Sequence, residues 1–212
     1  MQSKTFARVF LGVGLLFLFG HLFLDRIVKT GIESMGTRAL KVPVTVDSVV
    51  FSPLAGICSI EGLRIHNLPG YKERYLIEIG GIRAVWDLRS LWKAPIRVRS
   101  LTIHELLVNW EGTIRSNNLT QLQSGFEKGE GSGREVVLGT FKLDGVKARV
   151  HTPRTSPEGM LIEMSPMEFS NFSSRNPSVL VARIATEVAA EVVKHSLENG
   201  TLLQGLKRLF GR

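Results

Sequence analysis

The sequence predicts an α+β protein that is mainly β. An N-terminal transmembrane helix comes first, a long curved antiparallel β-sheet follows, and a C-terminal amphipathic helix ends the chain. Three observations predict this order: an apolar run opens the chain, long segments of alternating apolar and polar residues follow, and the last part returns to helical spacing. Alternation is the period of a strand, whereas recurrence every three to four residues is the period of a helix. The 212 residues therefore divide into 1–24 (cytoplasmic stub and anchor), 25–40 (helical connector), 41–175 (sheet) and 176–212 (amphipathic helices).

The opening apolar run predicts an uncleaved membrane anchor. Residues 9–24 contain no Asp, Glu, Lys or Arg, and as a helix they extend about 24 Å, which snorkelling of Arg8 and Arg26 lengthens. A cleaved signal peptide is the alternative, but no small-residue cleavage site follows the run. Lys4 and Arg8 favour a cytoplasmic N-terminus, although Arg26 and Lys29 on the other side oppose it. The main domain is therefore expected outside the cytoplasm.

Residues 25–40 are expected to continue as a helix beyond the membrane. Apolar residues recur there at helical spacing, at positions Ile27, Val28, Ile32, Met35 and Ala39. Pro43 then marks the change to strand chemistry.

The sheet region contains long strands whose apolar phase slips part-way along. The slips fall at Gly62, at Gly80–Gly81 and twice within residues 96–112. A slip turns the apolar side chains to the other face unless a bulge or bend absorbs it. Slips in neighbouring strands therefore predict a strongly curved sheet. Residues 96–112 alone would extend about 50 Å as one strand, so their apolar side needs a long cover, which could be a second sheet, a helix or a ligand.

The second half of the chain contains a break and then further strands. Residues 118–124 are expected to form a helical turn, and residues 125–135 are a flexible linker by composition. Two or three strands are expected over 136–145, 146–153 and 160–172. An amphipathic helix follows over 178–197, and a basic amphipathic segment closes the chain. Its candidate membrane-surface residues, which can lie on anionic lipid or pack on the sheet, are Leu203, Leu206, Lys207, Arg208 and Phe210.

The net charge and the absence of known motifs limit the classes of function that the sequence supports. The chain has 27 Lys and Arg against 19 Asp and Glu, a net charge of +8, which suggests an anionic partner or membrane surface. Nucleic acid is disfavoured because the domain is expected outside the cytoplasm. No nucleophile, phosphate-loop or metal motif occurs, so neither an enzyme nor a cofactor or metal is expected. The single cysteine, Cys58, fits a small apolar residue better than a nucleophile.

Two segments resemble the AsmA-like family of Gram-negative envelopes. Residues 45–71, TVDSVVFSPLAGICSIEGLRIHNLPGY, are similar to the family's opening hairpin, with one residue inserted before Pro69–Gly70. Residues 77–112 are similar to the next hairpin: Asp87, Leu88, Ser90, Leu91, Pro95 and Ile96 fall on its pattern, while Leu107 stands where the family often has proline. The later SNNLTQL and the Ala-rich C-terminal helix also resemble short members.

The resemblance implies an open, hydrophobic-lined β-groove on a single-pass inner-membrane protein whose domain lies in the periplasm. Long relatives are thought to conduct phospholipids, so the groove is expected to bind acyl chains and to assist lipid transport or envelope lipid homeostasis. Membrane phospholipid is the expected partner, with self-association or a larger envelope protein also possible. The groove candidates are Val44, Val46, Ile77, Ile79, Ala84, Trp86, Val98, Ile103, Val108 and Trp110.

Two alternatives remain open from the sequence. In one, the helix over 178–197 fills the sheet, and the protein is a non-enzymatic scaffold or assembly partner in an envelope complex. In the other, the chain is a subunit of a larger envelope transporter.

Overall fold

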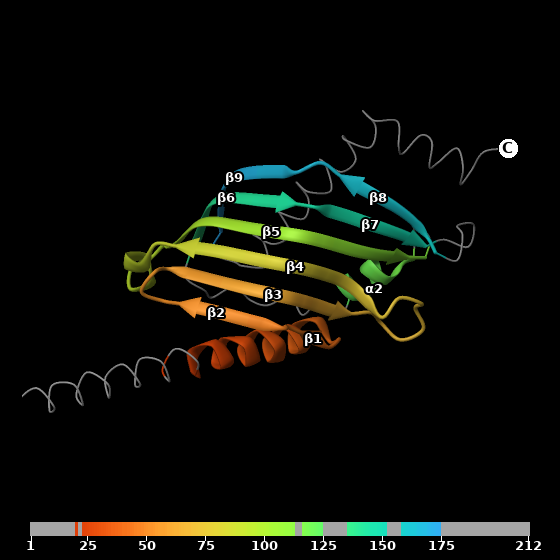
Figure 1. The fold of residues 1–212 in the computed structure, drawn as a ribbon, viewed down its shortest axis with the longest axis horizontal. Helices are drawn as coiled ribbons and strands as arrows, with labels where there is room; N and C mark the ends of the chain where they lie inside the picture. Colours follow the sequence, from red (N-terminus) through yellow and green to blue (C-terminus); the bar gives the residue numbers. More distant parts are fainter. Residues whose placement is uncertain (1–19, 21–22, 113–115, 125–134, 152–157, 175–212) are drawn as a thin grey trace, which may run out of the picture.

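One long, curved sheet dominates the computed structural model, which describes residues 20, 23–112, 116–124, 135–151 and 158–174 (Figure 1). A helix over 23–40 precedes the sheet. The described strands are β1 (Val44–Thr45), β2 (Ser48–Ser52), β3 (Ile57–His66), β4 (Tyr75–Trp86), β5 (Ile96–Glu111), β6 (Val136–Asp144), β7 (Val146–His151), β8 (Met160–Met164) and β9 (Met167–Ser174). The 3-10 helix η1 (Leu88–Leu91) precedes β5, and α2 (Asn118–Ser124) follows it. The predicted mainly-β fold is confirmed.

The strands form one open sheet of nine described strands. β1 and β2 pair in succession with β3, then come β4 and β5, and beyond β5 lie β6 with β9 and β7 with β8. The prediction of a purely antiparallel sheet is wrong at one place, because β5 runs parallel to β6 and β7. The reason is the connection: residues 112–135, which include α2, return the chain to the starting end of β5, as a parallel neighbour requires.

A row of residues crosses the whole sheet where the strands change phase. Its members come from successive strands or from the joints between them: Asp47, Gly62, Gly80, Glu105, Gly145 and Ser165. Pairing has the same register on both sides of the row; for example, Glu61 opposes Gly81 and Leu63 opposes Ile79, with Gly62 and Gly80 between them. The change of phase therefore falls at the same height in every strand of the sheet. We call this row the crease.

The crease keeps one face of the sheet apolar. In β4, Ile77 and Ile79 precede it and Ile82 and Ala84 follow it, so the apolar residues change from odd to even positions. A left-handed residue breaks the alternation of a strand, and φ is positive at Gly62 (62°), Glu105 (55°) and Gly145 (64°). The slips predicted at Gly62 and Gly80–Gly81 are confirmed as parts of one feature.

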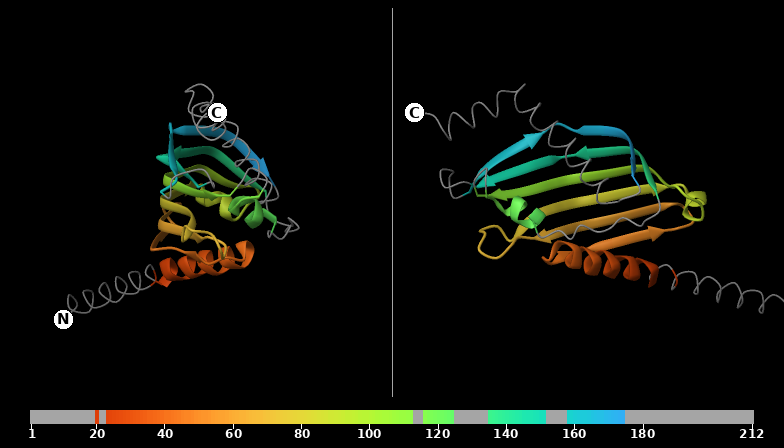
Figure 2. Two further views of the ribbon diagram at one scale, coloured as in Figure 1. Left: turned by 90° about the vertical axis from the view of Figure 1, so that its right-hand side faces the viewer. Right: turned by 180° about the vertical axis from the view of Figure 1, so that it is seen from behind.

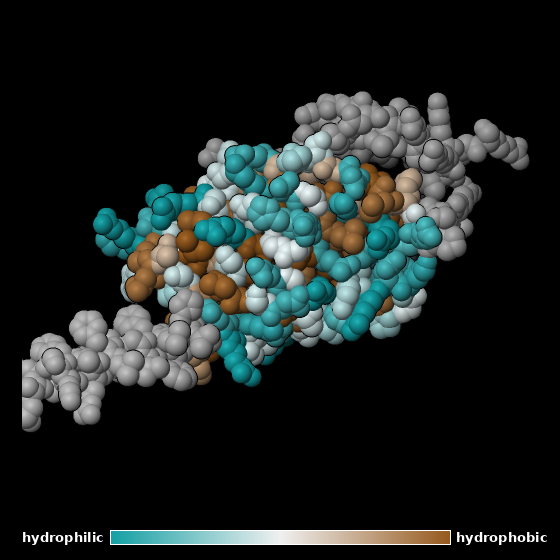
Figure 3. Space-filling model, in the orientation of Figure 1, coloured by the Kyte–Doolittle hydropathy of each residue, from teal (hydrophilic) through white to brown (hydrophobic). Residues whose placement is uncertain are grey.

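The two faces of the curved sheet differ in chemistry. Figure 2 shows α2 on the inner side of the curve, and Figure 3 shows the outer face with many hydrophilic side chains. Ion pairs cross neighbouring strands on that outer face, from Lys142 to Glu168 (3.0 Å) and from Lys147 to Glu163 (2.8 Å). These side chains are about half exposed, so the outer face is a solvated surface, and such exposed pairs contribute little to stability.

The helix over 23–40 runs along the edge formed by β1 and β2 (Figure 1). Its polar side chains accept hydrogen bonds from backbone N–H groups of that edge: Phe51 N to Asp25 Oδ1 (2.6 Å), Val46 N to Glu33 Oε1 (2.9 Å) and Val44 N to Thr37 Oγ1 (2.9 Å). An uncovered sheet edge would offer these groups to other chains. Two of the apolar residues whose spacing predicts this helix, Ile27 and Met35, are 51% and 72% exposed.

Several predicted elements fall outside the described residues. Among the residues that the structure describes, no helix has both the length and the apolarity needed to cross a membrane. The anchor over 9–24 lies mostly outside the described ranges, and so does the linker over 125–135. The C-terminal helices over 176–212 lie wholly outside them, including the surface candidates from Leu203 to Phe210. These elements stay predictions.

Candidate functional site: the apolar inner face

The strand registers collect apolar residues into rows across the inner face. One row reads Val44, Ile65, Ile77, Val108, Ala148 and Ile162, from β1 to β8. A second row, on the other side of the crease, reads Phe51, Cys58, Ala84, Leu101, Phe141 and Phe169, from β2 to β9. No charged residue interrupts either row. The sequence patterns of separate strands thus add up to one apolar face.

The predicted groove candidates fall into these rows or beside them. Val44, Ile77 and Val108 share the first row, and Ala84 lies in the second. Of the others, Ile79 opposes Leu106, Ile103 opposes Ile82, Trp86 opposes Val98 and Trp110 opposes Val150. Val46 lies between β1 and β2 and is buried. The structure therefore brings the candidates together on one face, whereas their contact with lipid stays a prediction.

The inner face is unevenly buried. On the β6 and β9 side, a core cluster contains Leu138, Phe141, Leu143, Val146, Met167 and Phe172, each at most 8% exposed. On the β3 and β4 side, Cys58, Ile82, Ala84 and Trp86 are only half-buried. Half-buried apolar side chains that a ligand could cover therefore remain over β3 and β4, and also on the neighbouring β5, where Leu101 and Ile103 are half-buried.

The end of the inner face that carries α2 is closed by a second core cluster. Leu122 of α2 packs there with Val42 and Leu76, and Leu119 of α2 lies against the same cluster. Leu76 is fully buried although it comes next to the inward Ile77. A register shift between Ile65 and His66 accounts for this, because it lets two consecutive β4 residues face the same side. We call this end the α2 end.

The opposite end carries η1, and we call it the η1 end. The Trp86 ring lies 5.4 Å from the Phe51 ring, between their centroids. The indole Nε1 of Trp86 is buried and has no hydrogen-bond partner among the described residues, which is costly for a donor removed from water. Nearby in the second row, burial raises the pKa of the Cys58 thiol, and the negative charge of Asp25 adds to the effect. A thiol with a raised pKa is a poor nucleophile at neutral pH, which agrees with an apolar role.

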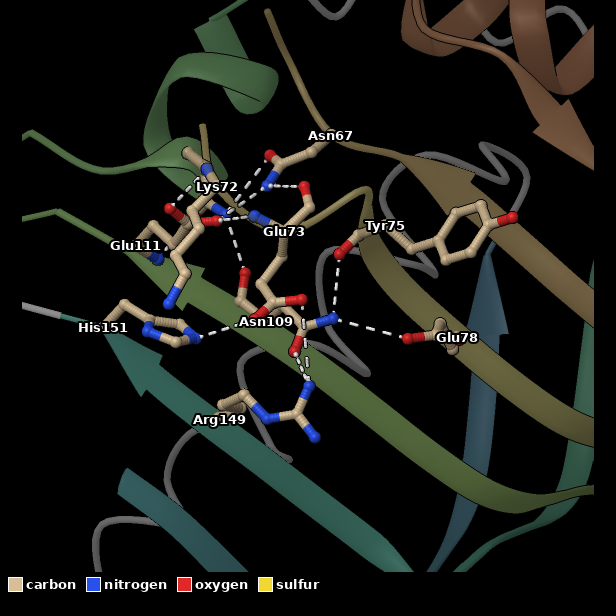
Figure 4. Close-up of polar contacts among 10 residues, drawn as sticks. Asn67, Lys72, Glu73, Tyr75, Glu78, Asn109, Glu111, Arg149 and His151 are labelled. Carbon is tan, nitrogen blue, oxygen red and sulfur yellow. Dashed lines mark hydrogen bonds and ion pairs between the residues drawn. The ribbon is translucent and has the colours of Figure 1, made fainter. Parts of the chain in front are cut away.

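A buried polar cluster holds the α2 end together, and sequence reasoning missed it (Figure 4). The Glu111 carboxylate, which is 7% exposed, accepts hydrogen bonds from the backbone N–H groups of Lys72 (2.8 Å) and Glu73 (2.7 Å) and from Asn67 Nδ2 (3.2 Å). The fully buried Asn118 of α2 donates to the carbonyl of Asn109 (2.7 Å) and accepts from Glu111 N (3.0 Å). These bonds fasten the β3–β4 loop and α2 to the end of β5.

The outer part of the same cluster contains an imidazole and a carboxylate in contact. His151 Nε2 lies 3.0 Å from Glu73 Oε1, and Arg149 Nη1 lies 3.9 Å from Glu73 Oε2. Arg149 also donates to the buried Asn109 (3.3 Å). The alternation of β5 does place Asn109 and Glu111 off the apolar face, but it gives no sign that a loop covers them. The arrangement is suited to positioning a loop.

Within the described ranges, no group of three or more His, Cys, Asp or Glu residues could hold a metal ion. No protein-family model, curated protein or solved structure matches this chain. The function is therefore argued from the apolar face itself.

Proposed function

We propose that the protein binds lipid acyl chains on the inner face of its sheet, over β3 and β4, and assists phospholipid transport or lipid homeostasis in a bacterial envelope. In this proposal an anchor over residues 9–24 holds it in the inner membrane and the sheet lies in the periplasm. The proposal agrees with the AsmA-like resemblance and involves no catalytic residue. Its partner is membrane phospholipid, with self-association or a larger envelope protein extending the short sheet.

One observation carries the proposal: the crease keeps apolar side chains on the same face along the full length of the sheet. A protein that needed only a core could bury such residues under its own chain. Here Ala84 and Cys58, in the middle of the second row, stay half-buried. Acyl chains match this surface because they are long, flexible and without hydrogen-bonding groups, and each buried CH₂ contributes about 0.8 kcal/mol.

A second candidate function has its own observation. The β6 and β9 side of the face is already buried, with Leu138 and Leu143 at 2% exposure. If residues 178–197 fill the rest of the face, the protein is a scaffold or assembly partner in an envelope complex.

The test compares two variants at adjacent β4 positions on opposite faces. Ala84 lies between Cys58 and Leu101 on the inner face, and Arg83 lies between Ser59 and Thr102 on the outer face. The full chain is extracted in mild detergent and analysed by native mass spectrometry with lipid identification. The full chain is needed because the helix over 23–40 supplies bonds to the sheet edge.

The proposal predicts stoichiometric phospholipid on the wild-type chain and on Arg83→Glu, and its loss from a folded Ala84→Glu. Circular dichroism controls for folding. A wild-type chain that carries no phospholipid, even after lipid is added, would favour the scaffold function.

A further inference from the structure

The η1 end of the sheet carries exposed apolar side chains from three separate segments. Leu54 lies in the turn between β2 and β3, Trp92 follows η1, and Phe23 belongs to the helix over 23–40. Their exposed fractions are 77%, 76% and 67%. Single exposed apolar residues are ordinary, but Figure 1 places these three segments at the same end of the sheet. Figure 3 shows hydrophobic side chains among hydrophilic ones at that end, on the left of the view.

Hydrogen bonds join the elements that carry these segments. The start of the helix is joined to β2 by the bond from Phe51 N to Asp25 Oδ1 (2.6 Å). The β2–β3 turn is joined to the end of β4 by the bond from Trp86 N to Gly56 O (2.9 Å). A methyl group added to Gly56 would lie 2.6 Å from the Trp86 carbonyl oxygen, so the two backbones are in close contact. The turn that carries Leu54 is therefore joined to the end of β4, the strand that precedes η1 and Trp92.

The charges that this end turns to solvent are basic. Exposed basic residues lie on the helix, around η1 and at the start of β5: Arg26, Arg89, Lys93, Arg97 and Arg99. The acidic residues of the same region are half-buried and accept hydrogen bonds within the protein: Asp25 from Phe51 N, Asp87 from Arg89 N and Glu135 from Ser173 Oγ. These acidic groups therefore accept hydrogen bonds within the protein, and the exposed basic charges at this end attract anions.

We infer that the η1 end docks on the surface of an anionic phospholipid bilayer, with Leu54 and Trp92 at the boundary between headgroups and acyl chains. Three features favour a bilayer over a protein partner. Tryptophan is enriched at that boundary, and basic residues near an anionic leaflet are attracted to it. The helix that contributes Phe23 also overlaps the end of the apolar run over 9–24. Docking would set the half-buried inner face of β3 and β4 beside the membrane.

The inference deepens the proposed function and rests on the proposed membrane residence, but not on lipid binding by the inner face. The test uses the full chain with Cys58→Ser, reconstituted into vesicles of phosphatidylcholine and phosphatidylglycerol. Single cysteines are introduced by Leu54→Cys or Trp92→Cys and labelled with an environment-sensitive fluorophore. Leu161→Cys is the matched control, because Leu161 is 50% exposed on β8, near the α2 end.

We expect a blue shift and quenching by lipid-borne nitroxide for the labels at positions 54 and 92, and a water-like spectrum at position 161. We also expect a smaller shift in vesicles of phosphatidylcholine alone, because the basic residues then lack an anionic surface. Water-like spectra at 54 and 92, or failure of the purified chain to associate with the vesicles, would overturn the inference. Equal shifts in both vesicle types would overturn its charge component.

The comparison of Ala84→Glu with Arg83→Glu tests the inner face separately. Docking labels that enter the bilayer while the wild-type chain carries no phospholipid would refute lipid binding and leave docking intact. The reverse outcome would refute docking and leave the inner-face proposal intact.

Discussion

The crease makes a quantitative prediction about Gly62. Its φ of 62° is left-handed, and an alanine there costs roughly 1–2 kcal/mol, offset by about 0.5 kcal/mol from the lower entropy of the unfolded chain. The added methyl group would also lie 2.0 Å from Asp47 Oδ2, so the Asp47 side chain must leave its position. That movement breaks the bonds from Arg64 to both Asp47 oxygens (2.6 and 2.8 Å). We expect Gly62→Ala to lower the free energy of unfolding by about 0.5–1.5 kcal/mol from the backbone alone, with the lost Asp47 bonds adding to this.

The assay is urea unfolding of the full chain in mild detergent, followed by circular dichroism. Gly31→Ala is the control, because a methyl group there meets nothing within 4 Å and the residue lies inside a helix; it should raise stability by about 1 kcal/mol. In an Asp47→Ala background, Gly62→Ala should cost less than in the wild type, because the two closest contacts, with Asp47 Oδ2 (2.0 Å) and Cγ (2.5 Å), are removed and only the one with Cβ (2.9 Å) remains. A Gly62→Ala protein as stable as the wild type would refute the left-handed crease.

Three further predictions concern the sheet edge and the titrating groups. Glu33→Ala should lower the free energy of unfolding by about 1–2 kcal/mol, because Val46 N loses its acceptor, whereas Glu33→Gln should retain most of it; equal losses would show that the acceptor does not matter. Burial raises the pKa of Cys58, so its reaction with a maleimide should stay slow at neutral pH and speed up only above the pH range in which ordinary thiols ionise. The reaction should become fast in denaturant. A folded protein that reacts at the rate of a free thiol would contradict this prediction. The hydrogen bond from Arg64 lowers the pKa of Asp47. The stabilisation by ionised Asp47 should therefore be present above the ordinary Asp pKa and lost as the pH falls through the lower pKa of the folded state. Asp47→Asn should lose less stability on acidification than the wild type, and parallel curves of stability against pH would count against the Arg64–Asp47 ion pair.

The sequence alone was sufficient for the strands and for the apolar face, because alternation reports which side chains share a face. It also located the crease residues Gly62 and Gly80 as slips. It could not show that the slips align, because alignment depends on the register between strands. The parallel pairing of β5 with β6 was missed for the same reason, since residues 112–135 carry no sign of their return path.

The polar contacts were less predictable. The helix over 23–40 is predicted from the spacing of its apolar residues. Its contacts with the edge strands come instead from the polar residues Asp25, Glu33 and Thr37. Asn118 and Glu111 are buried by a loop and a short helix that meet only after folding. The apolar and polar periodicity of one segment does not predict contacts between polar side chains of different segments.

The central claim is that acyl chains lie on the inner face, and photo-crosslinking tests it most directly. The full chain is reconstituted with a phospholipid that carries a diazirine on its acyl chain, irradiated and digested, and the modified residues are mapped by mass spectrometry. If acyl chains bind there, we expect adducts on inner-face residues of β3 and β4 such as Cys58, Ile82 and Ala84. Adducts confined to residues 9–24, or placed equally on outer-face positions such as Arg83, would contradict it.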